Sequence, residues 1–110
     1  MKVAGGVLRF KSRVMAVVAD IPEGRVTTYG TIAQHLQVTA RQVAFALATL
    51  TAKESKRLPW FRVVAANGVV SSTKLGSVGR RQIARLRAEG VAVTPRNKVE
   101  DFHVIAWSPG

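Results

Sequence analysis

The sequence TYGTIAQHLQVTARQVAFALATLTA, from Thr28 to Ala52, predicts two short helices joined by a turn. Thr28 can cap a helix over residues 29–36, and Thr39 can cap a second over residues 40 to about 52, because a threonine hydroxyl accepts hydrogen bonds from first-turn amides. Apolar residues at helical spacing give each helix an inward face: Ile32, Ala33, Leu36, Val43, Ala44, Leu47 and Leu50. This pattern indicates a helix-turn-helix, with an ordinary helical hairpin in a core as the alternative.

Charge separates these alternatives. The 110 residues carry 17 lysines and arginines against six aspartates and glutamates, a formal net charge of +11. Acidic residues are absent from Gly24 to Lys53 and again from Ser55 to Ala88. Long acid-free basic segments are typical of a protein that binds nucleic acid, although a merely soluble basic protein is the plainer alternative. The second helix also begins with Arg41 and Gln42, which suit DNA edges and phosphates, so the sequence favours double-stranded DNA as the partner.

The flanking segments complete a small, mainly helical domain. The same patterns predict helices over 8–19 and 78–89, a charged loop over 53–58, a short strand over 91–93, and a tail over 99–107 whose Phe102, Val104 or Ile105, and Trp107 dock on the core. Residues 63–71 read as two apolar runs joined through Asn67-Gly68, which favours the positive φ of a tight hairpin turn. A small β-hairpin after a helix-turn-helix makes a wing. We therefore predict a mainly α, winged helix-turn-helix DNA-binding domain that spans residues 1–110 as one unit.

Composition excludes several classes of function. The chain has no cysteine, which rules out disulfides, thiolate zinc sites and a thiol nucleophile. No apolar run approaches a membrane span, and the first residues do not form a secretory signal. We therefore expect a soluble protein that meets no membrane and is cytoplasmic and nucleoid-associated, or nuclear in a eukaryote. His35 and His103 have no partners at ligand or catalytic spacing, so we expect no metal, no cofactor and no catalytic residue.

The stretch PWFRVV, from Pro59 to Val64, places two large rings directly after a rigid proline. Proline fixes φ and donates no amide hydrogen bond, so it suits the entrance of a loop or an edge strand. On the simplest interpretation, Trp60 and Phe61 are both core residues. The alternative is that one of the rings forms the flat wall of a pocket.

Three motifs occur in order along the chain: IPEGRVTTYGTIA (21–33), ARQV (40–43) and PWFRVV (59–64). Together they resemble the DNA-binding domain of O6-alkylguanine-DNA alkyltransferases, from about Leu8 to Gly90. Those enzymes carry Pro-Cys-His-Arg-Val, and the cysteine takes the alkyl group from guanine. Trp60 stands at the cysteine position and Phe61 at the histidine position, which is the mark of the alkyltransferase-like proteins. Neither side chain can act as a thiolate or accept a proton, so the resemblance implies a protein that is not an enzyme.

The resemblance also implies roles for particular residues. Arg41 resembles the finger that fills the gap left by an extruded base, and Tyr29 resembles the pocket residue that crowds the phosphate. Trp60 would line the pocket for the flipped O6-alkylguanine, with the Val63 backbone available to the base edge. In this family the helix enters the minor groove, where side-chain insertion at a kinked step is common.

Two further positions are compared with the family, one that departs from the enzymes and one that matches them. Lys74 stands near the place where related non-catalytic proteins often carry an arginine, and it would be a weaker cation in the lesion pocket. Glu89 stands at the position of the acid that orients the histidine, and with Phe61 there it would have nothing to orient.

The leading hypothesis is therefore a monomeric, non-enzymatic sensor that flips O6-alkylguanine out of DNA and hands it to nucleotide excision repair proteins. One alternative is a winged-helix transcription regulator that binds undamaged DNA, which explains the charge but not Trp60 in place of a cysteine. A residual enzyme such as a glycosylase is the other, and it lacks a candidate acid or nucleophile.

Overall fold

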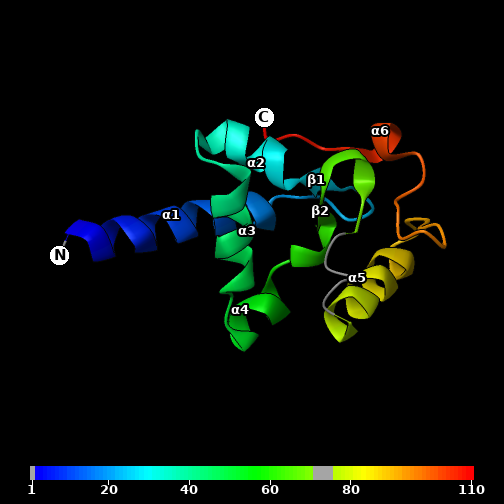
Figure 1. The fold of residues 1–110 in the computed structure, drawn as a ribbon, viewed down its shortest axis with the longest axis horizontal. Coiled ribbons are helices and arrows are strands. Elements are labelled where there is room, and N and C mark those ends of the chain that lie inside the picture. The colour runs from blue at the N-terminus through cyan, green and yellow to red at the C-terminus, as the bar shows by residue number, and fades with distance from the viewer. Residues whose placement is uncertain (1, 71–75) are drawn as a thin grey trace.

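Helices account for most of the fold (Figure 1). The computed structural model describes residues 2–70 and 76–110. In these residues the α-helices are α1 (Lys2–Ala19), α2 (Tyr29–Leu36), α3 (Ala40–Ala48), α4 (Ala52–Arg57), α5 (Ser77–Ala88) and α6 (Phe102–Ile105). The strands are β1 (Thr27–Thr28) and β2 (Val63–Val64), and 3-10 turns cover Trp60–Arg62 and Ala66–Gly68. The mainly helical fold class is confirmed. None of the described helices is long and apolar enough to cross a membrane.

The helix-turn-helix forms with both predicted threonine caps. The N–H of Thr31 donates to the Thr28 hydroxyl at 3.0 Å, and the N–H of Gln42 donates to the Thr39 hydroxyl at 3.1 Å. Gln37 adopts a left-handed φ of 59°, which ends α2 and turns the chain toward α3. Four of the predicted inward residues are buried: Ile32, Ala33, Leu36 and Val43.

α3 ends at Ala48, earlier than predicted, and most of the predicted charged loop is helix α4. The Thr49 hydroxyl turns back to donate to two carbonyls of the last turn of α3, each at 3.0 Å. Thr51 then starts α4, because its hydroxyl accepts the Glu54 N–H at 3.1 Å while the Glu54 carboxylate accepts the Thr51 N–H at 2.9 Å. This capping box turns a charged segment into a helix whose direction differs from that of α3 (Figure 1).

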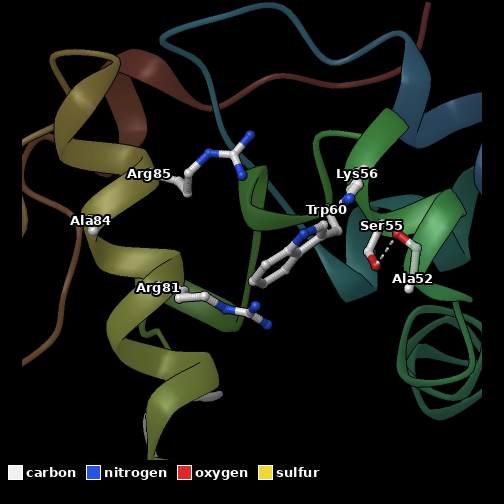
Figure 2. A pocket seen from close by; sticks show the side chains of 7 residues that line it. All are labelled: Ala52, Ser55, Lys56, Trp60, Arg81, Ala84 and Arg85. Atoms are coloured by element: carbon white, nitrogen blue, oxygen red, sulfur yellow. Dashed lines mark hydrogen bonds between the residues drawn. The ribbon is translucent and has the colours of Figure 1, made fainter.

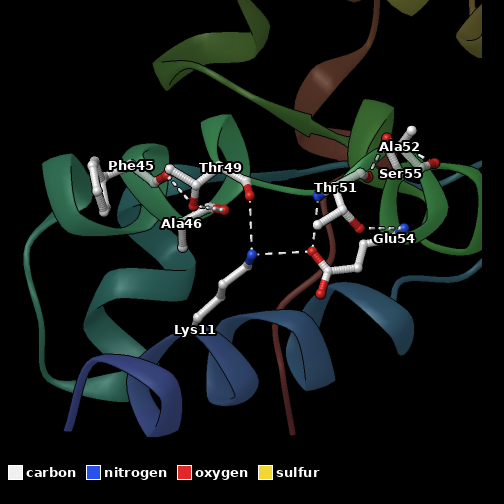
Figure 3. Close-up of polar contacts among 8 residues, drawn as sticks. All are labelled: Lys11, Phe45, Ala46, Thr49, Thr51, Ala52, Glu54 and Ser55. Atoms are coloured by element: carbon white, nitrogen blue, oxygen red, sulfur yellow. Dashed lines mark hydrogen bonds and ion pairs between the residues drawn. The ribbon is translucent and has the colours of Figure 1, made fainter. Parts of the chain in front are cut away.

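Lys11 of α1 ties this corner to the rest of the domain (Figure 3). Its ammonium donates to the Thr49 carbonyl at 3.0 Å and pairs with the Glu54 carboxylate at 3.0 Å. One cation therefore holds the end of α3 and the first turn of α4 against α1, which fixes the angle at which α4 leaves the helix-turn-helix.

The strands pair differently from the predicted hairpin. β2 runs parallel to β1, with Thr27 opposite Val63 and Thr28 opposite Val64. The turn at Asn67-Gly68 has the predicted positive φ angles of 62° and 87°, but the chain beyond it bridges in antiparallel fashion to Lys98 through Val69. The reason is burial: both residues of β2 are buried, so this segment behaves as an internal strand with apolar groups on both faces instead of one arm of an exposed wing.

Two hydrophobic clusters meet at β2. The first joins α1, α2 and α3, with Val14, Val18, Ile32 and Val43 among its fully buried members, and it includes Val63. The second contains Val64 and Phe61, Val26 just before β1, Val70 after the 3-10 turn, and residues from α5 and the segment that follows it: Leu86, Val91, Val93 and Val99. Adjacent valines of one strand therefore contribute to both clusters.

The C-terminal segment docks against residues 25–26. The N–H of Trp107 donates to the Val26 carbonyl at 2.7 Å, and the Arg25 guanidinium donates to the carbonyls of residues 105 and 106 at 2.9 and 2.8 Å. Phe102 and Ile105 pack against the second cluster and Trp107 packs against the first. The sequence left open whether Val104 or Ile105 docks on the core. Ile105 is the one that packs, because Val104 points outward and is 76% exposed.

Candidate nucleic-acid interface

Trp60 lies at the wall of an open cavity of about 370 Å³ between α4 and α5 (Figure 2). α4 contributes one face at spacing i, i+3, i+4, and α5 contributes another at the same spacing. The lining residues are Ala52, Ser55, Lys56, Trp60, Arg81, Ala84 and Arg85. The volume falls within the range of about 300–1,000 Å³ that is usual for small-molecule sites, which is enough for a nucleobase with a substituent.

The two rings of the PWFRVV stretch have different environments. Phe61 is buried in the second cluster, whereas Trp60 is half-buried and lines the cavity. The rings meet edge to face, with centroids 6.0 Å apart and planes at 88°. Phe61 is therefore a core residue, whereas Trp60 packs against the core and also lines the cavity.

Among the described residues, every charged side chain that lines the cavity is a cation. Lys56 reaches it from α4, and Arg81 and Arg85 reach it from α5 (Figure 2). The Arg85 guanidinium also lies 4.5 Å from the centre of the Phe61 ring, which restrains it by a cation–π contact. A positive rim around a flat aromatic wall suits a flat ring that arrives with its phosphates attached.

A buried glutamine fixes the backbone around Trp60. Gln82 of α5 is only 2% exposed, and its amide nitrogen donates to the carbonyls of Phe61 at 3.1 Å and Val63 at 2.9 Å. Gln82 is absent from the predicted site residues. Its signal was a polar side chain on the apolar face of a helix, three positions after the buried Gly79 and four before the buried Leu86.

Glu89 does have a partner to orient, contrary to expectation. The Arg62 guanidinium grips its carboxylate, with Nε 2.9 and 3.1 Å from the two oxygens and Nη2 also donating, and the N–H of Gly24 donates to it at 3.1 Å. Arg62 Nη1 in turn donates to the Ile21 carbonyl at 2.7 Å. Burial alone would raise the pKa of Glu89, but the hydrogen bonds from Arg62 and Gly24 and the nearby positive charge outweigh it, so the pKa lies below its usual value. The acid thus secures the 3-10 turn that carries Trp60.

The predicted DNA-contacting residues lie on the helix-turn-helix. Arg41 is exposed in the first turn of α3. Gln42 is exposed beside it, and its side-chain oxygen already accepts the Thr39 N–H at 2.9 Å, so the residue caps its own helix. Tyr29 is half-buried at the start of α2 and packs against the first cluster.

The predicted pocket residues are only partly brought together. Trp60 lines the cavity, whereas Tyr29 and Val63 are not among its lining residues. Val63 is buried, its N–H donates to the Trp60 carbonyl, and its carbonyl accepts from Gln82. Lys74 lies outside the described residues.

Comparison with known proteins places this arrangement in a family. Residues 9–91 match the family model for the "6-O-methylguanine DNA methyltransferase, DNA binding domain". Alkyltransferase-like protein 1 of Schizosaccharomyces pombe is 36% identical over 86 residues, which cover 76% of this chain and 78% of that protein. The chain belongs to the alkyltransferase-like proteins.

A further relative and a solved structure of the S. pombe protein resemble this alkyltransferase-like protein over most of its length. A "DNA base-flipping protein" of Escherichia coli is 43% identical over 101 residues, which cover 90% of this chain and 74% of that protein. The crystal structure of S. pombe Atl1, in complex with damaged DNA containing O6-carboxymethylguanine, superposes with a TM-score of 0.78 at 32% identity, and the match covers 92% of this chain and 96% of that one.

The alkyltransferase-like protein has no residue that could carry out alkyl transfer. It contains no cysteine, and the resemblance of PWFRVV to the enzymes' Pro-Cys-His-Arg-Val motif puts Trp60 and Phe61 at the positions of their cysteine and histidine. Neither an indole nor a phenyl ring supplies a nucleophile or a base for that reaction. The protein is non-catalytic, like the family to which it belongs.

Proposed function

We propose that this protein binds O6-alkylguanine in duplex DNA by flipping the damaged nucleotide out of the helix and holding it in the cavity beside Trp60. The observation that carries the proposal is an indole that lines an open cavity of about 370 Å³ at the position of the enzymes' reactive cysteine. A related protein of the same fold is seen in complex with DNA containing O6-carboxymethylguanine.

The energetics suit a damaged base. Extruding a nucleotide costs a few kcal/mol of stacking and pairing, and a modified guanine that pairs poorly costs least. Contact with an aromatic wall returns about 1–3 kcal/mol per base. The free energy gained by contact with the aromatic wall matches the free energy of extrusion only where the base pair is already weak. The cavity would therefore select lesions over normal guanine.

The remaining site residues fit this scheme. Exposed Arg41 would fill the vacated stack, and Gln42 would contact the duplex beside it through the amide nitrogen that its capping bond leaves outside. Tyr29 would crowd the phosphate of the flipped nucleotide. Lys74 would add a cation to the pocket, and the Val63 backbone would approach the base edge only if its carbonyl accepted a second hydrogen bond.

At the level of the cell, we propose that the 110 residues act as a single, monomeric DNA-binding domain where the genome is, in the nucleoid or the nucleus. A protein that binds a lesion without removing it must pass it on. Nucleotide excision repair proteins, which excise damaged strands, are the proposed recipients.

Tryptophan fluorescence tests the proposal. Trp60 and Trp107 are the two tryptophans of the chain, so a Trp107→Phe variant leaves Trp60 as the reporter. Titration with duplexes that differ only in O6-methylguanine against guanine should give a deeper quench and at least about tenfold tighter binding with the lesion, corresponding to about 1.4 kcal/mol. Equal affinity for the two duplexes would refute lesion recognition.

A further inference from the structure

α3 presents one large apolar ring to solvent. Phe45 is 62% exposed and is the one aromatic residue among the exposed large hydrophobic side chains of the described chain, the others being Val69 and Val104. α3 packs inward through Val43 and Ala46, so the fold does not need the Phe45 ring. Figure 3 shows the ring directed away from the polar cluster that Lys11 forms with the end of this helix.

The ring shares a face with Arg41. Residues four apart on a helix lie on the same side and about 6 Å apart along its axis. Ala48 is exposed at the end of the same helix, and Ala52, which lines the cavity, begins α4 four residues later. An exposed cation and an exposed ring therefore lie on one face of α3, the helix that precedes the cavity-lining α4.

The surroundings suit DNA as the group that covers this ring. The chain contains no acidic residue from Gly24 to Lys53, so nothing beside Phe45 on the helix-turn-helix repels phosphates. Base pairs are stacked about 3.4 Å apart, so two side chains about 6 Å apart can enter neighbouring but different steps of one duplex. Apolar side chains are common wedges at such steps, where they unstack the bases and bend the helix.

We infer that Phe45 is a second inserting side chain, which wedges into the base stack beside the step that Arg41 fills and so sets how far the DNA bends around the flipped nucleotide. This inference rests on the proposed function. Arg41 replaces the missing base, whereas Phe45 opens the adjacent step, and the bend turns the lesion toward the cavity. Contact between the ring and the separated bases offsets the stacking that the step loses.

The test compares Phe45→Ala and Phe45→Leu with a matched control, Val104→Ala, which trims an exposed apolar side chain on α6. Duplexes carry O6-methylguanine with 2-aminopurine placed in turn at each flanking step, together with a donor and acceptor dye at the ends. Wild type should give bright 2-aminopurine at one flanking step and a shortened dye distance. Phe45→Ala should lose both signals and bind the lesion about tenfold more weakly. Phe45→Leu should keep part of each signal, and Val104→Ala should match wild type.

The outcomes separate the inference from the proposed function. If wild type binds lesion and normal duplexes equally, the proposed function fails. If wild type prefers the lesion but Phe45→Ala keeps the same 2-aminopurine signal and the same bend, Phe45 is not a wedge and the inference is overturned. Unchanged circular dichroism of each variant shows that the fold is intact, as expected for a side chain this exposed.

Discussion

The Arg62–Glu89 pair should account for a measurable and acid-sensitive part of the stability. The two side chains are only 14% and 12% exposed, and the contact is bidentate. Exposed ion pairs contribute up to about 1 kcal/mol, whereas breaking a fully buried pair costs about 3–5 kcal/mol. A pair that is mostly buried lies between these limits, so we expect a coupling free energy of about 2 kcal/mol at neutral pH.

A double-mutant cycle measures this coupling directly. Arg62→Met, Glu89→Gln and the double variant are unfolded in urea and followed by circular dichroism, and the coupling is the part of the two single effects that does not add. The cycle also cancels the general acid sensitivity of a chain with a net charge of +11. The matched control is Lys11→Met with Glu54→Gln, a more exposed pair whose coupling should be smaller.

The sign of the pH dependence follows from the lowered pKa of Glu89. Its usual value is 4.5, and in the fold it lies below that. The stabilisation is therefore fully present above the usual value and is lost as the pH falls through the lowered one. We expect the coupling to be unchanged from about pH 7 to about pH 5 and to fall away in stronger acid, once the pH passes below the lowered pKa of Glu89. A coupling below about 0.5 kcal/mol at neutral pH, or one that survives in acid, would refute the account of this pair.

Three further perturbations test the site. Gln82→Leu leaves two buried carbonyls without the amide that donates to them, so it should lower the free energy of unfolding in urea by about 2–4 kcal/mol and weaken lesion binding, because the turn that carries Trp60 is no longer held. Full stability would mean that water replaces the amide. Arg41→Ala should weaken binding to lesion duplex at least about tenfold in fluorescence titration, since the vacated stack stays empty, and an unchanged Kd would exclude it as the finger. Arg81→Gln should reduce the dependence of log Kd on log salt by about one, whereas Arg80→Gln, which lies off the cavity face, should not; equal slopes for the two variants would place Arg81 away from phosphate.

Local signals predicted the helix-turn-helix well. Thr28 and Thr39 cap the helices as expected because capping depends on residues within one turn. The positive φ at Asn67 and Gly68 was predicted for the same reason. The boundary between α3 and α4 was missed although its cause is also local: Thr51 and Glu54 form a capping box that the sequence contains, hidden in a segment whose charge suggested a loop.

Long-range choices could not be derived from local pattern. β2 pairs with residues 36 positions earlier, and nothing in VVAANGVV distinguishes that partner from the nearer arm of a hairpin. Likewise, the cavity needs a face of α4 and a face of α5 to meet around Trp60, a meeting that spacing within each helix does not reveal. The resemblance to a known family pointed to a pocket at Trp60, but not to the Arg62–Glu89 grip or the Gln82 brace behind it.

The two valines of β2 have a consequence for engineering. Val63 faces the cluster of the helix-turn-helix and Val64 faces the cluster behind the cavity, so a slip of one residue would exchange the two interiors. The helix-turn-helix and the cavity beside Trp60 therefore both depend on strand β2. A transfer of the cavity to another pair of DNA-binding helices would work only if the recipient protein supplied a hydrophobic cluster for each valine. The helix-turn-helix and the cavity are therefore one structural unit and not two interchangeable modules.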